Sequence, residues 1–305
     1  MIKATMMTSI SALLTLVLFI SACTEPQETA MEGPPAATVI EEAEAAKSVG
    51  TRLRKALREA PEKVVPQFEA RSYGYAVEDT MRYRLMLPLN YDQTRSYPLV
   101  VCLAGATARG DDNVNQVVGA WAAHVLAQPD NRDKYPCFVL VPQCPQVSNW
   151  GYSVPDSVKA KWEEPATSPI PEGVAPAVFS LIDELSGEFN IDGNRVYVTG
   201  HAMGGYGTWH FIITRPDLFA AAVPVAAGAD SELAEAILHV PVWAFHGEDD
   251  GAVPIAYSRD IIEAMRKAGA NPRYTVFPGA RHLIWPLAYD DPELLDWIFA
   301  QTRSR

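Results

Sequence analysis

The chain has 305 residues, of which 48% are hydrophobic, and it carries a formal net charge of −12. This length and hydrophobic content are sufficient for one large domain with its own core, plus additional segments. Because the net charge is strongly negative, the chain lacks the excess of Lys and Arg needed to neutralise phosphates, and nucleic acid is excluded as an expected partner.

The first 22 residues are predicted to be a signal peptide. Lys3 gives it a positive start, and the apolar run over residues 10–20 is too short to span a bilayer comfortably. The run ends in Ile20-Ser21-Ala22-Cys23, which resembles a bacterial lipobox with Cys23 as the lipidated first residue of the mature chain. The alternative is an ordinary secretory signal that ends near a cysteine. Both predict export. The lipobox predicts a bacterial lipoprotein anchored to a membrane through Cys23, at the periplasmic side (the outer membrane is preferred) or the cell surface.

Residues 23–68 are expected to connect this anchor to the folded domain. The segment from 24 to about 40 is rich in Pro, Glu, Ala and Thr and has no apolar period, which predicts a disordered tether. Between residues 41 and 60 the apolar side chains fall on one helical stripe, which predicts a helix on the flank of the domain or an extension of the stalk.

Residues 69–305 are predicted to form an α/β domain around an eight-stranded, mostly parallel sheet with an antiparallel start and helices on both faces. The first two strands are separated by only three residues and must be antiparallel, whereas later strands are continuous apolar runs typical of a buried parallel sheet. The predicted strands are Arg71–Val77, Met81–Leu87, Leu99–Leu103, Phe138–Val141, Arg195–Thr199, Ala221–Val225, Val242–Phe245 and Arg273–Phe277. The predicted helices are Val114–Ala127, Val174–Phe189, Gly205–Arg215, Glu232–Leu238, Ala256–Ala268 and Pro292–Gln301.

The strongest chemical signal lies between the fifth predicted strand and the helix that follows it. Residues 200–205 read Gly-His-Ala-Met-Gly-Gly, the glycine pattern of a nucleophile elbow, in which a strained turn presents its middle residue at the end of a buried strand. The apex of this turn would be Ala202, and the N–H of Met203 would point at the same spot from the start of the helix.

Two later loops carry an acid and a histidine. The strand Val242–Phe245 runs into a loop with Asp250, for which Asp249 is the only serious rival, and the strand Arg273–Phe277 runs into a loop with His282. Elbow, acid and histidine follow one another along the chain in the order that this elbow requires.

From about Phe68 to Phe299 the chain resembles the bacterial phospholipase/carboxylesterase-like and polyhydroxybutyrate-depolymerase-like esterase branch of the α/β-hydrolase superfamily, close to dienelactone hydrolases and feruloyl-type esterases. The resemblance rests on these three elements, on the segment 98–113 after the third strand, and on the turn Pro142-Gln143-Cys144-Pro145. It implies ester hydrolysis through a serine, with Asp250 orienting His282 and with no metal or organic cofactor.

The same resemblance implies an oxyanion hole made by the N–H groups of Ala106 and Met203. The chain departs from the family pattern twice: Ala104 stands where the family usually has histidine, and Ala202 stands where it has the nucleophilic serine.

A methyl group at position 202 has no lone pair to attack a carbonyl, so no acyl-enzyme can form. Three interpretations follow: a natural pseudoenzyme that keeps an ester-binding pocket, an esterase with an engineered Ser-to-Ala change, or a weak hydrolase in which Asp250 and His282 activate water. Because the leader is present and the pattern also breaks at Ala104, we favour natural loss.

The expected ligand is a small-molecule ester, and aromatic residues suggest an aryl or saccharide ester. Trp150, Tyr206 and Trp285 are the candidate pocket walls, although large aromatic residues are more often core. Residues 145–173, which also include Trp162, predict either a pocket cover or surface packing. After the leader, Cys102, Cys137 and Cys144 remain. They permit one disulfide, but buried thiols are the better interpretation, and their spacing suggests no metal site.

Overall fold

The computed structural model describes residues 51, 54–75, 80–151 and 173–303. The predicted signal peptide, the lipidation site Cys23, the tether and Trp162 lie outside these residues, so export and the lipid anchor remain predictions. None of the helices within the described ranges has both the length and the apolar character needed to cross a membrane.

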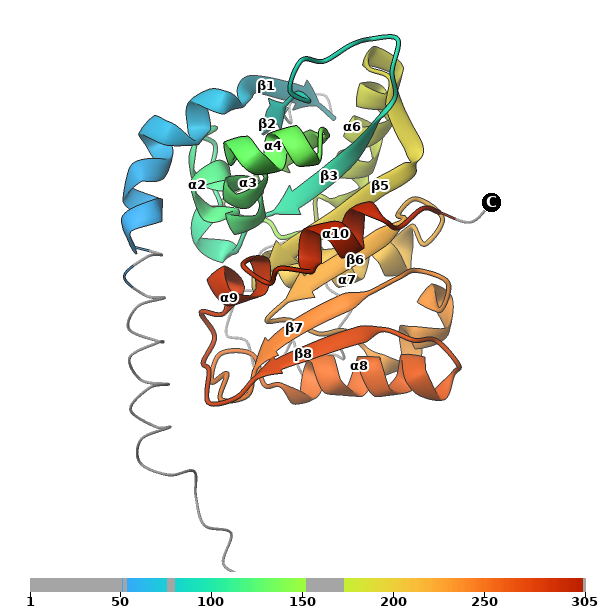
Figure 1. Cartoon of the computed structure of the whole chain (residues 1–305). Coiled ribbons are helices and arrows are strands. Elements are labelled where there is room, and N and C mark those ends of the chain that lie inside the picture. Colours follow the sequence, from blue (N-terminus) through green and yellow to red (C-terminus); the bar gives the residue numbers. More distant parts are fainter. Residues whose placement is uncertain (1–50, 52–53, 76–79, 152–172, 304–305) are drawn as a thin grey trace, which may run out of the picture.

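One eight-stranded sheet runs through the domain in the order β1-β2-β4-β3-β5-β6-β7-β8 (Figure 1). The first two strands pair antiparallel with each other, β2 pairs antiparallel with β4, and the remaining pairs are parallel. The predicted sheet with its antiparallel start is confirmed. The strands are β1 (Glu69–Gly74), β2 (Thr80–Met86), β3 (Tyr97–Leu103), β4 (Phe138–Pro142), β5 (Ile191–His201), β6 (Ala221–Val225), β7 (Trp243–Gly247) and β8 (Arg273–Phe277).

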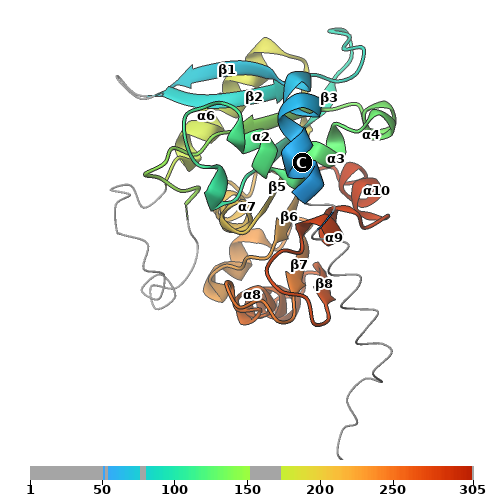
Figure 2. The same ribbon diagram turned by 90° about the vertical axis from the view of Figure 1, so that its left-hand side faces the viewer.

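Helices cover both faces of the sheet, as Figure 2 shows from the side. One layer contains α6 (Ala175–Glu188), α7 (Met203–Thr214), η3 (Ser231–Ile237) and α8 (Ala256–Lys267). The other contains a helix over residues 54–63, η1 (Val65–Gln67), η2 (Ala106–Ala108), α2 (Asn115–Gly119), α3 (Trp121–Leu126), α4 (Pro129–Lys134), α9 (Trp285–Tyr289) and α10 (Leu294–Phe299).

The alternation of side chains along the buried strands separates two cores. On β3, Leu99, Val101 and Leu103 belong to the core under α6–α8, while Val100 and Cys102 belong to the core under α3 and α10. A strand buried on both faces needs apolar residues at every position, which explains why the sequence shows continuous runs there.

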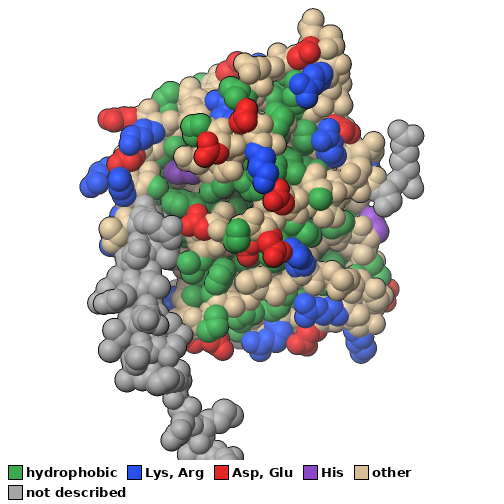
Figure 3. All heavy atoms as spheres, in the orientation of Figure 1, with side chains coloured by type: hydrophobic (Ala, Val, Ile, Leu, Met, Phe, Trp, Pro, Cys, Tyr) green, Lys and Arg blue, Asp and Glu red, His purple; other side chains and the backbone are tan. Residues whose placement is uncertain are grey.

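The helix over residues 54–63 packs on the domain, as the first of the two sequence interpretations expected. Ala60 and the following Val64 and Val65 are buried in the second core. On the same side of the molecule, apolar side chains also gather at the surface (Figure 3), and a narrow crevice between α3 and α10 is lined mainly by hydrocarbon.

The single helix predicted over residues 114–127 is wrong, because the structure has two helices there. The break falls at Ala120, whose φ of −91° and ψ of 90° are extended rather than helical. The residue before it, Gly119, packs so closely on Ala108 that a Cβ atom would lie 2.7 Å from the Ala108 methyl. A contact made in the tertiary structure therefore sets the direction of α3. The local helical period of the sequence gives no sign of this contact.

Close approach of α7 to β3 depends on Gly204. A Cβ atom at this position would overlap the backbone carbonyl of Leu103. We therefore expect Gly204→Ala to lower the free energy of unfolding by about 3 kcal/mol, since a rigid backbone cannot relax as a side chain can. Gly187→Ala is the matched control, because Gly187 lies on α6 with open space around it, and the change should stabilise the helix by up to about 1 kcal/mol. Urea unfolding measures both; equal stability of the two variants would contradict the close packing.

Candidate active site

Four loops that carry predicted site residues leave the sheet at one edge. They follow β3, β5, β7 and β8, which are parallel, so their carboxyl ends lie on the same side. The register pairs Leu103 with Gly200 and Gly247 with Phe277. This edge is where open α/β sheets bind ligands.

Ala202 lies at a strained turn between β5 and α7. Its φ of 51° and ψ of −120° are unusual for a residue with a side chain, and such conformations cost about 1–3 kcal/mol. Two backbone hydrogen bonds hold the turn: the Ala202 N–H donates to the Val225 carbonyl at 3.0 Å, and the Ala202 carbonyl accepts from the Tyr206 N–H at 3.0 Å. The residue is only partly buried. The strand–turn–helix geometry predicted for residues 200–205 is therefore present, with a methyl group at its apex.

The predicted oxyanion-hole residues occupy equivalent places on neighbouring strands. Ala106 is the first residue of η2 and Met203 the first residue of α7, and each follows its member of the pair Leu103–Gly200 by three positions. The first N–H groups of a helix have no acceptor within that helix. The N–H groups of Ala106 and Met203, which have no acceptor within their helices, thus lie three residues beyond two paired strand positions at the edge of the sheet.

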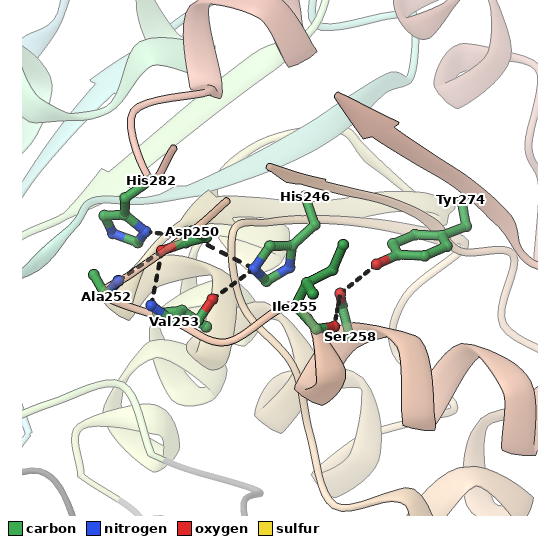
Figure 4. A network of polar contacts seen from close by, with 8 residues as sticks. All are labelled: His246, Asp250, Ala252, Val253, Ile255, Ser258, Tyr274 and His282. Carbon is green, nitrogen blue, oxygen red and sulfur yellow. Dashed lines mark hydrogen bonds and ion pairs between the residues drawn. The ribbon is translucent and has the colours of Figure 1, made fainter. Parts of the chain in front are cut away.

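Asp250 and His282 form a hydrogen-bonded pair (Figure 4). The His282 Nδ1–H donates to Asp250 Oδ2 at 2.8 Å, while Asp250 Oδ1 accepts from the N–H groups of Ala252 and Val253 at 2.9 and 2.8 Å. The carboxylate is buried, and the imidazole is 24% exposed. Asp249, the rival acid, is exposed. The structure brings Asp250, and not its neighbour, to the histidine.

This arrangement fixes the charge of the acid and the tautomer of the base. Burial disfavours the ionised Asp250 carboxylate, but the polar contacts with His246, His282 and the Val253 N–H outweigh it and hold the pKa of Asp250 well below its usual range. An ionised carboxylate only accepts, so the proton of a neutral His282 is on Nδ1 and its lone pair is on Nε2. This is the tautomer that a general base in such a site needs.

Trp285 joins the histidine loop to the strand that carries the apex. Its indole stacks on the His201 ring with 4.2 Å between centroids and an interplanar angle of 22°, and it meets the His282 ring edge to face at 5.8 Å. Burial, together with the charges of His282 and His124, lowers the pKa of His201 to about 3, so this imidazole is neutral. Residues 201 and 282 thus share one aromatic neighbour.

Two of the three proposed pocket walls are core residues, which corrects the prediction for them. Trp150 and Tyr206 are 0% and 2% exposed and belong to the core under α6–α8. The Trp150 indole N–H donates to the Ala104 carbonyl at 2.9 Å, so Trp150 supports the predicted oxyanion loop from behind. Only Trp285 is partly exposed. Aromatic character alone does not distinguish a wall from a core residue, because both require a large apolar surface.

His246 also belongs to the site, although the sequence did not predict it. It is fully buried on β7, and its Nε2 lies 2.9 Å from the Val253 carbonyl oxygen and 3.3 Å from Asp250 Oδ2. The only sequence signal for this role was its position just before the loop that carries Asp250. A lone histidine in a buried strand does not show toward which partner its ring points.

No cluster of His, Cys, Asp or Glu suited to a metal ion occurs in the described part of the chain. Cys102, Cys137 and Cys144 are buried, and Cys102 and Cys137 are free thiols. Burial raises the pKa of Cys137 to about 12 and that of Cys102 well above its ordinary value, so neither is a ready thiolate. The three thiols are core residues.

Comparison with known proteins agrees with this geometry. Residues 155–284 match the dienelactone hydrolase family. The chain is 31% identical to poly(3-hydroxyalkanoate) depolymerase C of Paucimonas lemoignei over 131 residues, which is 43% of this chain and 28% of the depolymerase. The crystal structure of a thermostable esterase superposes with a TM-score of 0.70 and 38% identity, over 79% of this chain and 64% of that one.

A third similarity is to a serine-to-alanine variant of the feruloyl esterase module from Clostridium thermocellum, complexed with sinapinate. The TM-score is 0.52 with 17% identity, over 81% of this chain and 94% of the module, a likeness of fold. The chain spans less than two thirds of the length of the depolymerase and of the thermostable esterase. Residues 155–284 are therefore similar to the dienelactone hydrolase family, and the chain has the α/β-hydrolase fold of the esterases that it resembles.

Proposed function

We propose that this chain is an esterase-type hydrolase that has lost its nucleophile and retains a site for an ester or for the carboxylate derived from it. One observation carries the proposal: the elbow, the Asp250–His282 pair and the two backbone donors are all present, while the apex is Ala202. Such a site can bind and polarise an ester carbonyl through the donors. It has no group that could form an acyl-enzyme.

The proposed ligand class is an aryl ester or a phenolic carboxylate. Two observations support it: the partly exposed Trp285 lies beside His282, and the alanine variant of the feruloyl esterase module is complexed with sinapinate. An aromatic ring against an indole gains apolar burial as well as the electrostatics of ring pairing.

A second candidate function is slow hydrolysis by water. The observation in its favour is the tautomer of His282, whose Nδ1 donates to Asp250 and whose Nε2 is therefore a base. Direct attack by water gives up covalent catalysis, so turnover should be small.

The test measures binding and turnover on the unmodified chain. We expect sinapinate and a feruloyl ester to bind, with turnover no higher than that of His282→Ala, which controls for contaminating esterase. Calorimetry measures the first and release of the free acid the second. Turnover clearly above that of His282→Ala would assign the chain to the water mechanism. Absence of binding by both ligands would contradict the aryl ligand class.

A larger side chain at position 202 tests whether the ligand binds at the apex of the turn. Ala202→Leu places a larger side chain where the ester carbonyl is proposed to lie, so we expect sinapinate to bind at least roughly tenfold more weakly, since a clash at the centre of a site costs more than about 1.4 kcal/mol. Leu89→Ala is the control, because Leu89 lies between β2 and β3, at the opposite end of β3 from the site, and its side chain is exposed. Equal affinities of the two variants would place the ligand elsewhere.

A further inference from the structure

The Asp250 carboxylate accepts three hydrogen bonds and has a second imidazole close to one of its oxygens. Oδ1 accepts from the backbone N–H groups of Ala252 and Val253, Oδ2 accepts from His282 Nδ1, and His246 Nε2 lies 3.3 Å from Oδ2. Figure 4 shows the two imidazoles on opposite sides of the carboxylate. His246 comes from β7, inside the sheet, whereas His282 comes from a surface loop. Asp250 therefore lies between the buried His246 imidazole and the His282 imidazole, which it orients.

The chemistry of its neighbours fixes which His246 nitrogen is protonated. Nε2 faces two groups that only accept, the Val253 carbonyl and the ionised Asp250 carboxylate, so this nitrogen carries the proton. The His246 Nε2–H therefore contacts both the first and the last residue of the segment 250–253. The hydrogen bond from the Val253 N–H to Asp250 Oδ1 joins the same two residues directly.

Packing alone does not explain a histidine at this position. The His246 side chain is fully buried, and its second nitrogen, Nδ1, has no hydrogen-bond partner among the described residues. A buried polar atom without a partner is destabilising, so an apolar side chain of similar size would suit the core better. The donor at Nε2 is what the imidazole adds.

We propose that His246 is a positioning residue that holds Asp250 in the orientation His282 requires, by placing its Nε2–H between the Val253 carbonyl and the carboxylate oxygen that His282 uses. The inference deepens the proposed function, because it assigns a role within the acid–base pair on which that function rests. His246 does not touch the ligand; it acts through Asp250. Its loss should leave Oδ2 held by His282 alone, so that only the two backbone hydrogen bonds at Oδ1 still orient the carboxylate.

The surroundings of Asp250 determine the expected pH dependence. His246 faces it from β7 and His282 from the loop after β8, while Glu248 and Asp249 on its own loop are exposed. Beyond His246, Ser258 and Tyr274 hydrogen-bond to each other at 2.7 Å. The His246 donor is one of the contacts that keep the pKa of Asp250 low, so without it the carboxylate should take up a proton at a higher pH.

The test is proton NMR of the full chain, without ligand or turnover. The His282 Nδ1–H that donates to a carboxylate should give a strongly downfield resonance, which disappears on acidification as Asp250 is protonated. His246→Leu should shift this resonance upfield and move its loss to higher pH. His246→Gln, whose amide can donate from about the place of Nε2, should restore both toward the unmodified values.

The matched control is His124→Leu. His124 is also a buried histidine that bonds to a backbone carbonyl, that of Val117, and it makes no contact with Asp250. This variant should leave both readouts unchanged even where stability falls. If His246→Leu does not fold, His246→Asn replaces it, because the shorter amide stops before Asp250. An unchanged resonance and an unchanged acid midpoint in a folded His246→Leu or His246→Asn variant would overturn the proposal. Because no ligand is used, a failure of ester binding would leave this result intact.

Discussion

The Ala202→Ser variant should hydrolyse short-chain aryl esters at least roughly 10³-fold faster than the unmodified chain. Removing the serine from a serine hydrolase lowers turnover by roughly 10⁶, and what remains comes from the oxyanion hole and binding. The variant places a hydroxyl at the apex of a turn already held at φ 51°, so the backbone needs no rearrangement. Initial rates with p-nitrophenyl acetate measure the gain.

The control for this substitution is Ala226→Ser. Ala226 is also an alanine at positive φ, 50°, at the end of the neighbouring strand β6, so the change adds the same hydroxyl one strand away from the apex. It should give no gain. If Ala202→Ser is folded and no faster than Ala226→Ser, the site lacks more than its nucleophile, and the second departure at Ala104 becomes the first position to examine.

In the Ala202→Ser background, Asp250→Asn should lower kcat by roughly 10⁴, the size of effect seen when the acid of such a triad becomes an amide. An amide NH₂ at the place of Oδ2 would face the N–H groups of His282 and His246. If the amide oxygen turned there instead, the NH₂ group would face the backbone N–H groups of Ala252 and Val253. With either orientation the pairing that keeps the His282 proton on Nδ1 is disturbed.

Asp249→Asn is the matched control, because it removes the same charge from the adjacent, exposed residue. We expect a change of no more than about twofold, since an exposed charge is screened by solvent. Steady-state kinetics of the two double variants separate the carboxylates. A larger loss from Asp249→Asn than from Asp250→Asn would assign the acid to position 249.

The sequence by itself determined which segments form the strands of the sheet and which loops carry the candidate site residues. Continuous apolar runs identified the buried strands, because a strand covered on both faces cannot alternate. Glycines at 200, 204 and 205 identified the sharp turn, because a side chain at 204 would overlap β3. The alanine at its apex was equally readable.

Only the tertiary structure decided which residues meet. It selected Asp250 over Asp249, placed Trp150 and Tyr206 in the core, and brought His246 to the acid. It also divided the predicted helix over residues 114–127, through a contact of Gly119 with Ala108 of η2. The physical reason is common to all four: each outcome depends on a contact with a partner outside the residue's own element. The local periodicity of the sequence shows which face of a helix or strand is apolar. Which residues that face contacts is decided by the packing of segments that are distant in the sequence.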